Sequence, residues 1–381
     1  MVCRGIQTPP RDNLKLFATL AEALRRSGIQ HPDQHVIIVR DFLAVCTLVK
    51  PTPWSDEQTE AVRAQCRSRE LTPIWYRGIR SDELNYPDEF PGPPGMQGDW
   101  YHHAARQLFS DRAQDFVDQW RFDIRPPIDD RPFFSDFCKL SSIAALEEAF
   151  GELWLTRAEL ALLFVIVAMV LVGGCGAVLT VAPLLLLPSL RGTPGRAVTG
   201  CYFAFIGLGY LLLEMVYLSR LTQLIGDPVV TAAATIATFL LASGAGSMVA
   251  QRLRRHSARA VLISVILLIL ITLVEWFSFS GLLHWAGEWP AIGRNIVAAL
   301  LVAPPAFLMG FPMPLGLKRL DRGQQVLLPW AWGVNGFASV VATPLATVIG
   351  MSWGFSHAGA VALILYLAAA MLLVRLPDSS I

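Results

Sequence analysis

Long apolar runs, separated by short polar breaks, fill the chain from about Glu159 to the C-terminus. A helix that crosses the roughly 30 Å hydrocarbon core of a bilayer needs about 20 mostly apolar residues. The pattern therefore predicts an α-helical polytopic membrane bundle of about seven transmembrane helices, called spans 1 to 7, over residues 156–381. The qualifying runs are Glu159–Leu187, Gly200–Gly226, Val229–Ala250, Arg259–Leu283, Asn295–Leu317, Val326–Gly350 and Phe355–Val374.

Residues 1–155 carry the mixed polar and apolar pattern of a soluble segment. We predict a helix over Asn13–Leu24, with Asp12 as its N-cap and Gly28 just beyond its end. The segment reads as part of an α/β sheet domain, without a complete βαβ unit or a GxGxxG turn for phosphates. The other expected elements are strands at His35–Arg40, Ala44–Val49 and Pro73–Tyr76, helices from Ser55 to about Arg69 and over about Trp100–Phe109, and a Pro/Gly loop at Pro87–Gly98.

The composition agrees with a division into two classes of structure. Over 381 residues, 54% are hydrophobic and 16% charged, whereas soluble domains carry about 25% charged residues. A net charge of +1 gives no argument for binding nucleic acid. The six cysteines form no CxxC pair or metal-type spacing, so we expect neither a disulfide framework nor a zinc site.

Basic residues are concentrated in alternate connections between the predicted spans, which places those connections in the cytosol. With seven spans, the soluble segment then falls on the other side of the membrane. A chain that starts at Met1 without a signal peptide would instead keep that segment inside, but ten basic residues agree on the first arrangement. They are Arg191, Arg196, Arg252, Arg254, Arg255, Arg259, Lys318, Arg319, Arg322 and Arg375.

Glu214 is the first candidate for a functional residue in the membrane. It lies well inside span 2, where an ionisable group costs at least ~2.5 kcal/mol and usually faces the bundle interior with a partner. Tyr210 and Tyr217 share its helix face, whereas Arg220 lies on another face near the helix end and is placed to snorkel to the interface. Two interpretations stay open: a group that contacts a proton or a substrate, and a structural residue that fixes helix packing.

Asn335 in span 6, beside Gly333 and Gly336, is a second candidate, for which an interhelical hydrogen bond is the simpler role. Glu275 and His284 are expected near the outer end of span 4, where an interfacial position explains both.

In the soluble segment, Asp129, Asp130 and Arg131 resemble a carboxylate pair for acid–base or metal chemistry. Neighbouring side chains diverge, so the alternative is a turn in which Asp caps the chain and Arg131 pairs locally. His102 and His103 would be weak metal ligands.

Several short sequence segments, in order and over nearly the whole chain, resemble the C-terminal part of bacterial membrane-fused spermidine-synthase-like proteins. That family has the S-adenosylmethionine-dependent, class I methyltransferase-type fold. The segments are Thr8–Leu16, His35–Arg40, Asp123–Phe134, Tyr202–Glu214, Leu224–Pro228, Gly244–Ser247, Gly310–Gly316 and Trp330–Gly336.

The resemblance implies a membrane-embedded portion of an aminopropyl- or methyl-type transferase, in the bacterial inner (plasma) membrane, with the lipid bilayer as its surroundings. The family's glycine-rich cofactor loop and catalytic aspartates precede the matched region, so we expect this chain alone to bind neither S-adenosylmethionine nor its decarboxylated form. Any activity would need a separate N-terminal partner chain. The alternative is a non-enzymatic transport or scaffold membrane protein, in which the bundle with Glu214 handles a small solute.

Overall fold

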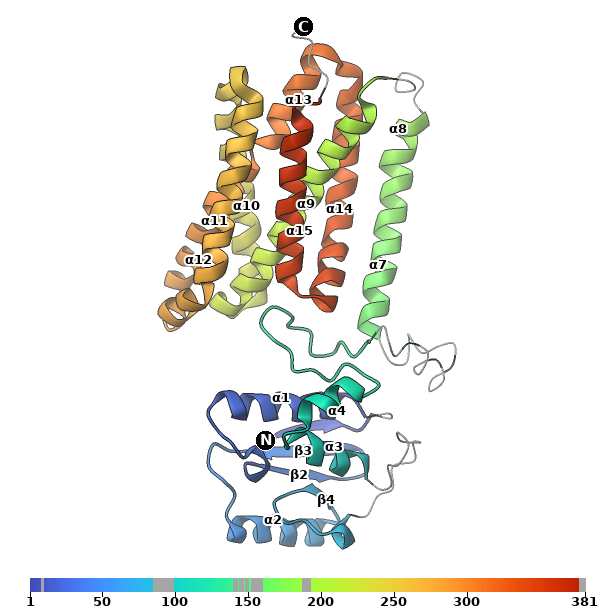
Figure 1. The fold of residues 1–381 in the computed structure, drawn as a ribbon, viewed down its shortest axis with the longest axis vertical. Helices are drawn as coiled ribbons and strands as arrows, with labels where there is room; N and C mark the ends of the chain where they lie inside the picture. Colours follow the sequence, from blue (N-terminus) through green and yellow to red (C-terminus); the bar gives the residue numbers. More distant parts are fainter. Residues whose placement is uncertain are drawn as a thin grey trace. The chain divides into compact units, whose positions relative to one another are not determined.

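The computed structural model describes residues 1–7, 10–84, 99–139, 160–186 and 193–376, with the single positions 143, 147 and 151. The chain forms two compact units (Figure 1). Unit 1 comprises Met1–Ile128 and Pro132–Leu163, and unit 2 comprises Asp129–Arg131 and Phe164–Ile381. The boundary predicted at 155/156 and the whole of the loop predicted at Pro87–Gly98 lie outside the described residues.

Unit 1 is built on a four-stranded sheet in the order β1-β3-β2-β4, antiparallel at every pairing. The central pair β2 and β3 is joined by a tight turn in which the Asp41 carboxylate accepts hydrogen bonds from the N–H groups of Leu43 and Ala44, at 2.7 and 2.6 Å. These bonds hold the pKa of Asp41 below its ordinary value. The strands are β1 (Val2–Gly5), β2 (Val36–Arg40), β3 (Ala44–Val49) and β4 (Thr72–Trp75).

Helices cover both faces of this sheet. The predicted strands and helices are confirmed, with β3 and the end of α2 at the predicted residues. Asp12 as an N-cap is wrong: it is the first helical residue, and its carboxylate pairs with Arg4 at 2.5 Å. Strand β1 and helix α4 were not predicted. The helices are α1 (Asp12–Arg26), α2 (Asp56–Arg69), α3 (Trp100–Leu108) and α4 (Ala113–Gln119), with 3₁₀ turns at Pro32–Gln34 and Ser81–Glu83.

The alternation of side chains along β2 separates two apolar layers. Val36 and Ile38 belong to the larger cluster, which α1 and α3 complete with Phe17 and Tyr101. Ile37 and Val39 point to the other face and pack with Cys66 of α2. Because β2 is buried along its whole length, the sheet is the middle layer of three.

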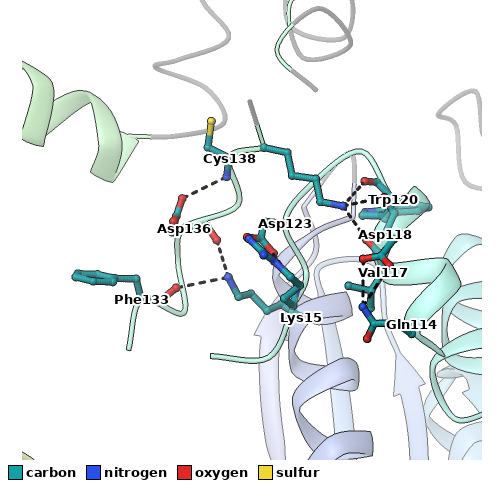
Figure 2. A network of polar contacts seen from close by, with 11 residues as sticks. Lys15, Gln114, Val117, Asp118, Trp120, Asp123, Phe133, Asp136 and Cys138 are labelled. Atoms are coloured by element: carbon teal, nitrogen blue, oxygen red, sulfur yellow. Dashed lines mark hydrogen bonds and ion pairs between the residues drawn. The ribbon is translucent and has the colours of Figure 1, made fainter. Parts of the chain in front are cut away.

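A polar network fastens the segment after α4 to unit 1 (Figure 2). Lys15 donates to the carbonyl of Asp136 at 2.5 Å, and Lys139 donates to the carbonyls of Val117, Asp118 and Trp120, which close the end of α4. Burial raises the pKa of the Asp123 carboxyl, but the hydrogen bonds and charge of Arg125, with the charge of Lys15, lower it by more, so the net shift is downward. The segment after α4 is thus held by hydrogen bonds between lysine side chains and backbone carbonyls, and not by pairing of its backbone in a helix or strand.

Among the described residues, seven helices are long and apolar enough to cross a membrane, so the predicted multi-pass bundle is confirmed at that level. They span Leu162–Leu186, Arg196–Ile225, Pro228–Leu253, Ala258–Ala286, Ala291–Leu320, Gln325–Ser352 and Phe355–Leu373. Their elements are α7 (Leu160–Gly176), a π-helical stretch (Ala177–Val181), α8 (Ala182–Leu186), α9 (Arg196–Ile225), α10 (Pro228–Ala250), a 3₁₀ stretch (Gln251–His256), α11 (Ser257–Ala286), α12 (Ala291–Met309), α13 (Pro312–Gly323), a 3₁₀ turn (Gln325–Leu327), α14 (Leu328–Ser352) and α15 (Phe355–Leu373).

Helix α9 lies at the centre of the bundle, in contact with α10, α14 and α15. Helix α7 stands at the edge (Figure 1), and its most apolar window is 0% buried by the described chain, as expected of a helix that faces lipid. Backbones approach closely where α10 meets α12: a Cβ on Gly246 would lie 1.9 Å from the Phe307 carbonyl oxygen, and one on Gly310 would lie 2.2 Å from that of Ser243. Only glycine permits this contact.

The fifth span is a broken helix. Helix α12 ends at Met309, and α13 begins at Pro312 after the short link Gly310–Phe311. Non-helical backbone at membrane depth is tolerated where it is buried in protein or lines a cavity. The break at Gly310 does line a cavity, described next.

Candidate functional site in the membrane bundle

A partly open cavity of about 310 Å³ lies among the central helices of unit 2, and is called here the central cavity. The residues that line it come from α9, α10, α14, α15 and the helix break of the fifth span. Its wall mixes apolar side chains with hydroxyl and amide groups and carries no charged residue. The lining residues are Ile206, Gly207, Tyr210 and Leu211 of α9; Leu240, Ser243 and Ser247 of α10; Met309, Gly310 and Met313 at the helix break; Asn335 and Ser339 of α14; and Tyr366 of α15.

Hydrogen bonds between helices hold several of these polar groups in place. The Asn335 amide donates to the Phe203 carbonyl at 2.9 Å, so this candidate makes an interhelical bond. Ser247 donates to the Gly310 carbonyl at 2.8 Å. Tyr210 and Ser243 share a bond of 3.2 Å. The cavity wall is therefore built from oriented acceptors and donors rather than from loose side chains.

Glu214 lies one helical turn after Tyr210 on the same side of α9, since residues at i and i+4 stack along one helix face. Its side chain is buried, with 9% exposed. Among the described residues it has neither a hydrogen-bond nor an ion-pair partner. Buried carboxylates in membranes are normally paired, so Glu214 is an unusual group. It is not itself a lining residue of the central cavity, but lies one helical turn beyond the lining residue Tyr210.

A second, much smaller cavity lies between α9 and α11, and its polar residues are called the Arg220 cluster: Tyr217, Arg220 and Glu275. The Tyr217 hydroxyl donates to the Glu275 carboxylate. The Arg220 guanidinium lies 4.3 Å from the centroid of the Trp276 ring, a cation–π arrangement. The cavity volume is about 20 Å³, which is enough for one water molecule, because a water needs roughly 10–15 Å³ on this measure.

The Arg220 cluster bears on two expectations. Glu275, for which an interfacial position was expected, is half-buried in the wall of the small cavity, within α11. Arg220 does more than snorkel, because it packs on Trp276 and donates to the Ser356 hydroxyl at 3.5 Å. Tyr217, which shares a face with Tyr210 through contacts of both rings with Phe239, bonds to Glu275 rather than to Glu214.

The tripeptide Asp129–Arg131 belongs to unit 2, where it caps a membrane helix. The Asp130 carboxylate accepts hydrogen bonds from the Ser356 N–H at 2.8 Å and from the Ser356 hydroxyl at 2.6 Å. The Asp130 carbonyl accepts from the Phe355 N–H at 2.9 Å, and the Asp129 carbonyl accepts from the Gln223 amide at 3.0 Å.

Asp130 therefore satisfies the free N–H groups of the first turn of α15, which has no side-chain cap of its own because Gly354 stands at the N-cap position. Gly354 has φ +99°, and a Cβ there would lie 2.2 Å from the Asp130 carboxylate. Asp130 thus caps, but its target is a helix 226 residues away and not the local turn expected from the sequence. Only one of the two carboxylates takes part in this contact.

The histidine candidates of unit 1 have structural surroundings. Nδ1 of His102 lies 2.8 Å from the Ile74 carbonyl, and the His103 ring packs near Phe116. Within the described part of the chain, no group of three or more His, Cys, Asp or Glu side chains is placed to hold a metal ion.

Sequence reasoning missed the serines of the central cavity and Tyr366, because single hydroxyls in apolar runs give no signal of their own. Ser243 and Ser247 stand four residues apart within the small-residue patch of α10, and that spacing was the available clue.

Comparison of this chain with models of known families, with curated proteins and with solved structures finds no match in any of the three. The resemblance to spermidine-synthase-like proteins therefore stays a hypothesis that rests on the matching sequence segments alone.

Proposed function

We propose that this chain is the membrane-embedded portion of a spermidine-synthase-like, S-adenosylmethionine-dependent transferase, and that a separate chain supplies the cofactor-binding half. The observation that supports the proposal is the open edge of the sheet in unit 1. Strand β1 pairs only with β3 among the described residues, and Val2 is exposed. An edge strand with free N–H and C=O groups is a template for another strand.

The implied chemistry is an attack by an amine nitrogen on a carbon activated by a sulfonium. The new C–N bond forms as the C–S bond breaks, the thioether leaves with the electron pair, and the amine loses a proton. The partner chain would supply the residues that hold the cofactor and accept the proton. In this proposal unit 1 completes the sheet and unit 2 holds the assembly in the bilayer.

Titration of the purified chain in detergent with S-adenosylmethionine and with its decarboxylated form tests this proposal. We expect no binding by the chain alone, and binding after co-purification with a chain that carries the strand–GxGxxG–helix pattern, from the neighbouring genomic DNA. Val2→Lys on the open edge should weaken that co-purification, whereas Ser68→Lys on the exposed side of α2 should not. Tight cofactor binding by the chain alone, or equal effects of the two substitutions, would contradict the proposal.

A second function, in which the bundle binds and moves a small solute without enzymatic chemistry, is favoured by one observation. Glu214 is a buried carboxylate without a partner in the described chain, and it lies one helical turn along α9 from Tyr210, which lines a cavity large enough for a small molecule. If this function is correct, Glu214→Gln should abolish a solute flux in proteoliposomes, while assembly with a cofactor-binding chain is unchanged. A wild-type flux that Glu214→Gln leaves intact would exclude it.

A further inference from the structure

The wall of the central cavity carries no charged residue. None of its lining residues is Lys, Arg or His, and the nearest acidic group along α9 is Glu214, one turn beyond Tyr210. A buried carboxylate without a counter-charge is costly in a low-dielectric setting. A ligand that brings a positive charge next to this carboxylate would remove that cost, whereas an anion would increase it.

The broken helix at the cavity points the same way. The carbonyl end of α12 reaches the cavity at Met309 and Gly310, and the C-terminus of a helix carries partial negative charge. Helix α13 starts at the same place, and helix N-termini generally attract anions through free N–H groups. However, its first and third residues are Pro312 and Pro314, which have no N–H to donate.

The size and chemistry of the wall limit the ligand further. A volume of about 310 Å³ lies at the lower end of the range of small-molecule sites. Tyr210 and Tyr366 supply aromatic rings, which attract ammonium groups. Tyr366 is 1% exposed, and no partner for its hydroxyl is found among the described residues. The thioethers of Met309 and Met313 give an adaptable apolar surface for a short alkyl stem.

We propose that the central cavity binds a small organic ammonium ion, whose charged group pairs with the Glu214 carboxylate and whose alkyl part lies against Met309 and Met313. The proposal rests on the second function above, a solute-binding bundle, and names the chemical class of its solute. It does not depend on the transferase hypothesis.

Three probes of equal shape and different charge test this proposal: butylamine, butanol and butyrate. Equilibrium dialysis of the full chain in lipid nanodiscs, corrected with empty nanodiscs, measures their binding. We expect butylamine to bind at least tenfold more tightly than butanol, and butyrate not to bind. Equal binding of the three probes, or a preference for butyrate, would overturn the proposal.

Matched variants locate the site. Glu214→Gln should reduce butylamine binding to the level of butanol, whereas Glu275→Gln, which changes the carboxylate of the Arg220 cluster, should leave it unchanged. If Glu214→Gln fails to fold, Ser339→Leu, which fills the central cavity and leaves the carboxylate in place, should abolish butylamine binding. Binding that survives in a folded Glu214→Gln or Ser339→Leu variant would refute the proposal. Binding without flux in proteoliposomes would instead refute transport and keep the site.

Discussion

The capping of α15 by Asp130 predicts a measurable loss of stability when the carboxylate is removed. Asp130→Ala removes a carboxylate that accepts two hydrogen bonds from Ser356, at 2.8 and 2.6 Å. The backbone bond from the Phe355 N–H to the Asp130 carbonyl is retained. The substitution therefore isolates the side-chain contribution to the first turn of the last membrane helix.

The expected loss follows from these two bonds. Replacement of an N-cap side chain by Ala costs typically about 1 kcal/mol and up to about 2, and a charged acceptor places this case in the upper half of the range. Gly354, at the N-cap position, has no side chain to take over. We expect a loss of about 1–2 kcal/mol, which corresponds to a fall in Tm of about 2–8 °C for a unit of this size.

Thermal unfolding of the full chain in detergent, followed by circular dichroism, measures this loss. The matched control is Asp129→Ala, because Asp129 contributes only its backbone carbonyl, to the Gln223 amide. Its exposed carboxylate has no partner among the described residues. Asp130→Asn should fall between the two, since an amide oxygen can accept the same bonds without the charge. Equal Tm values for Asp129→Ala and Asp130→Ala would show that the cap contributes nothing.

Three further predictions concern other positions. Gly354→Ala should lower Tm by at least as much as Asp130→Ala, because Ala at φ +99° is strained and its Cβ would meet the capping carboxylate at 2.2 Å. Cys3 and Cys46 stand directly opposite on β1 and β3, with sulfurs 2.7 Å apart, so treatment with diamide should remove two titratable thiols; Cys46→Ser should prevent it, and an unchanged thiol count in the wild type would contradict the pairing. The folded-state pKa of Asp123 is lowered, so its contribution to stability is present above about pH 4, the unfolded-state pKa, and is lost as pH falls through the folded-state pKa; acid unfolding followed by tryptophan fluorescence should be less steep with pH in Asp123→Asn.

The membrane spans were predictable because each depends on a local property. A helix in lipid satisfies its own backbone and needs only a sufficient apolar length, so every predicted run corresponds to a helix of unit 2. The same holds for β3, whose bounds Ala44–Val49 were predicted, and for α2, where Ser55 and Gln58 form the capping box. Local sequence carries each of these signals within a few residues.

Contacts between distant residues could not be predicted in this way. Asp130 and Ser356 are separated by 226 positions, and Tyr217 and Glu275 by 58, so no spacing rule connects them. Cys3 and Cys46 were set aside because cysteine spacing alone does not report strand register. Strand β1 has four residues and a mostly exposed pattern, too short for a hydrophobic alternation to stand out. Helix α4 has only seven residues, and the carbonyl of Val117 near its end accepts a hydrogen bond from Lys139, 22 residues along the chain.

The candidate site was partly accessible from sequence. Glu214 stands out because ionisable groups are rare in apolar runs, and its burial is borne out by the structure. The cavity beside it depends on a helix break and on serines from another helix, and neither has a distinctive local pattern. Span 5 was predicted as one continuous run, Asn295–Leu317, so neither the break after Met309 nor the cavity at Met309 and Gly310 was predicted.

The cap on α15 also bears on the order in which the protein is made. Asp130 leaves the ribosome 226 residues before Ser356, so the group that finishes the last helix is synthesised before any of the seven spans. The Asp130 carboxylate then has no helix to cap until Gly354 and the start of α15 have been synthesised and placed on the same side of the bilayer. The contact between Asp130 and Ser356 can therefore form only if α15 begins on the same side of the membrane as Asp130. In a chain with one span inserted in the wrong orientation, the Asp130 carboxylate would not meet Ser356.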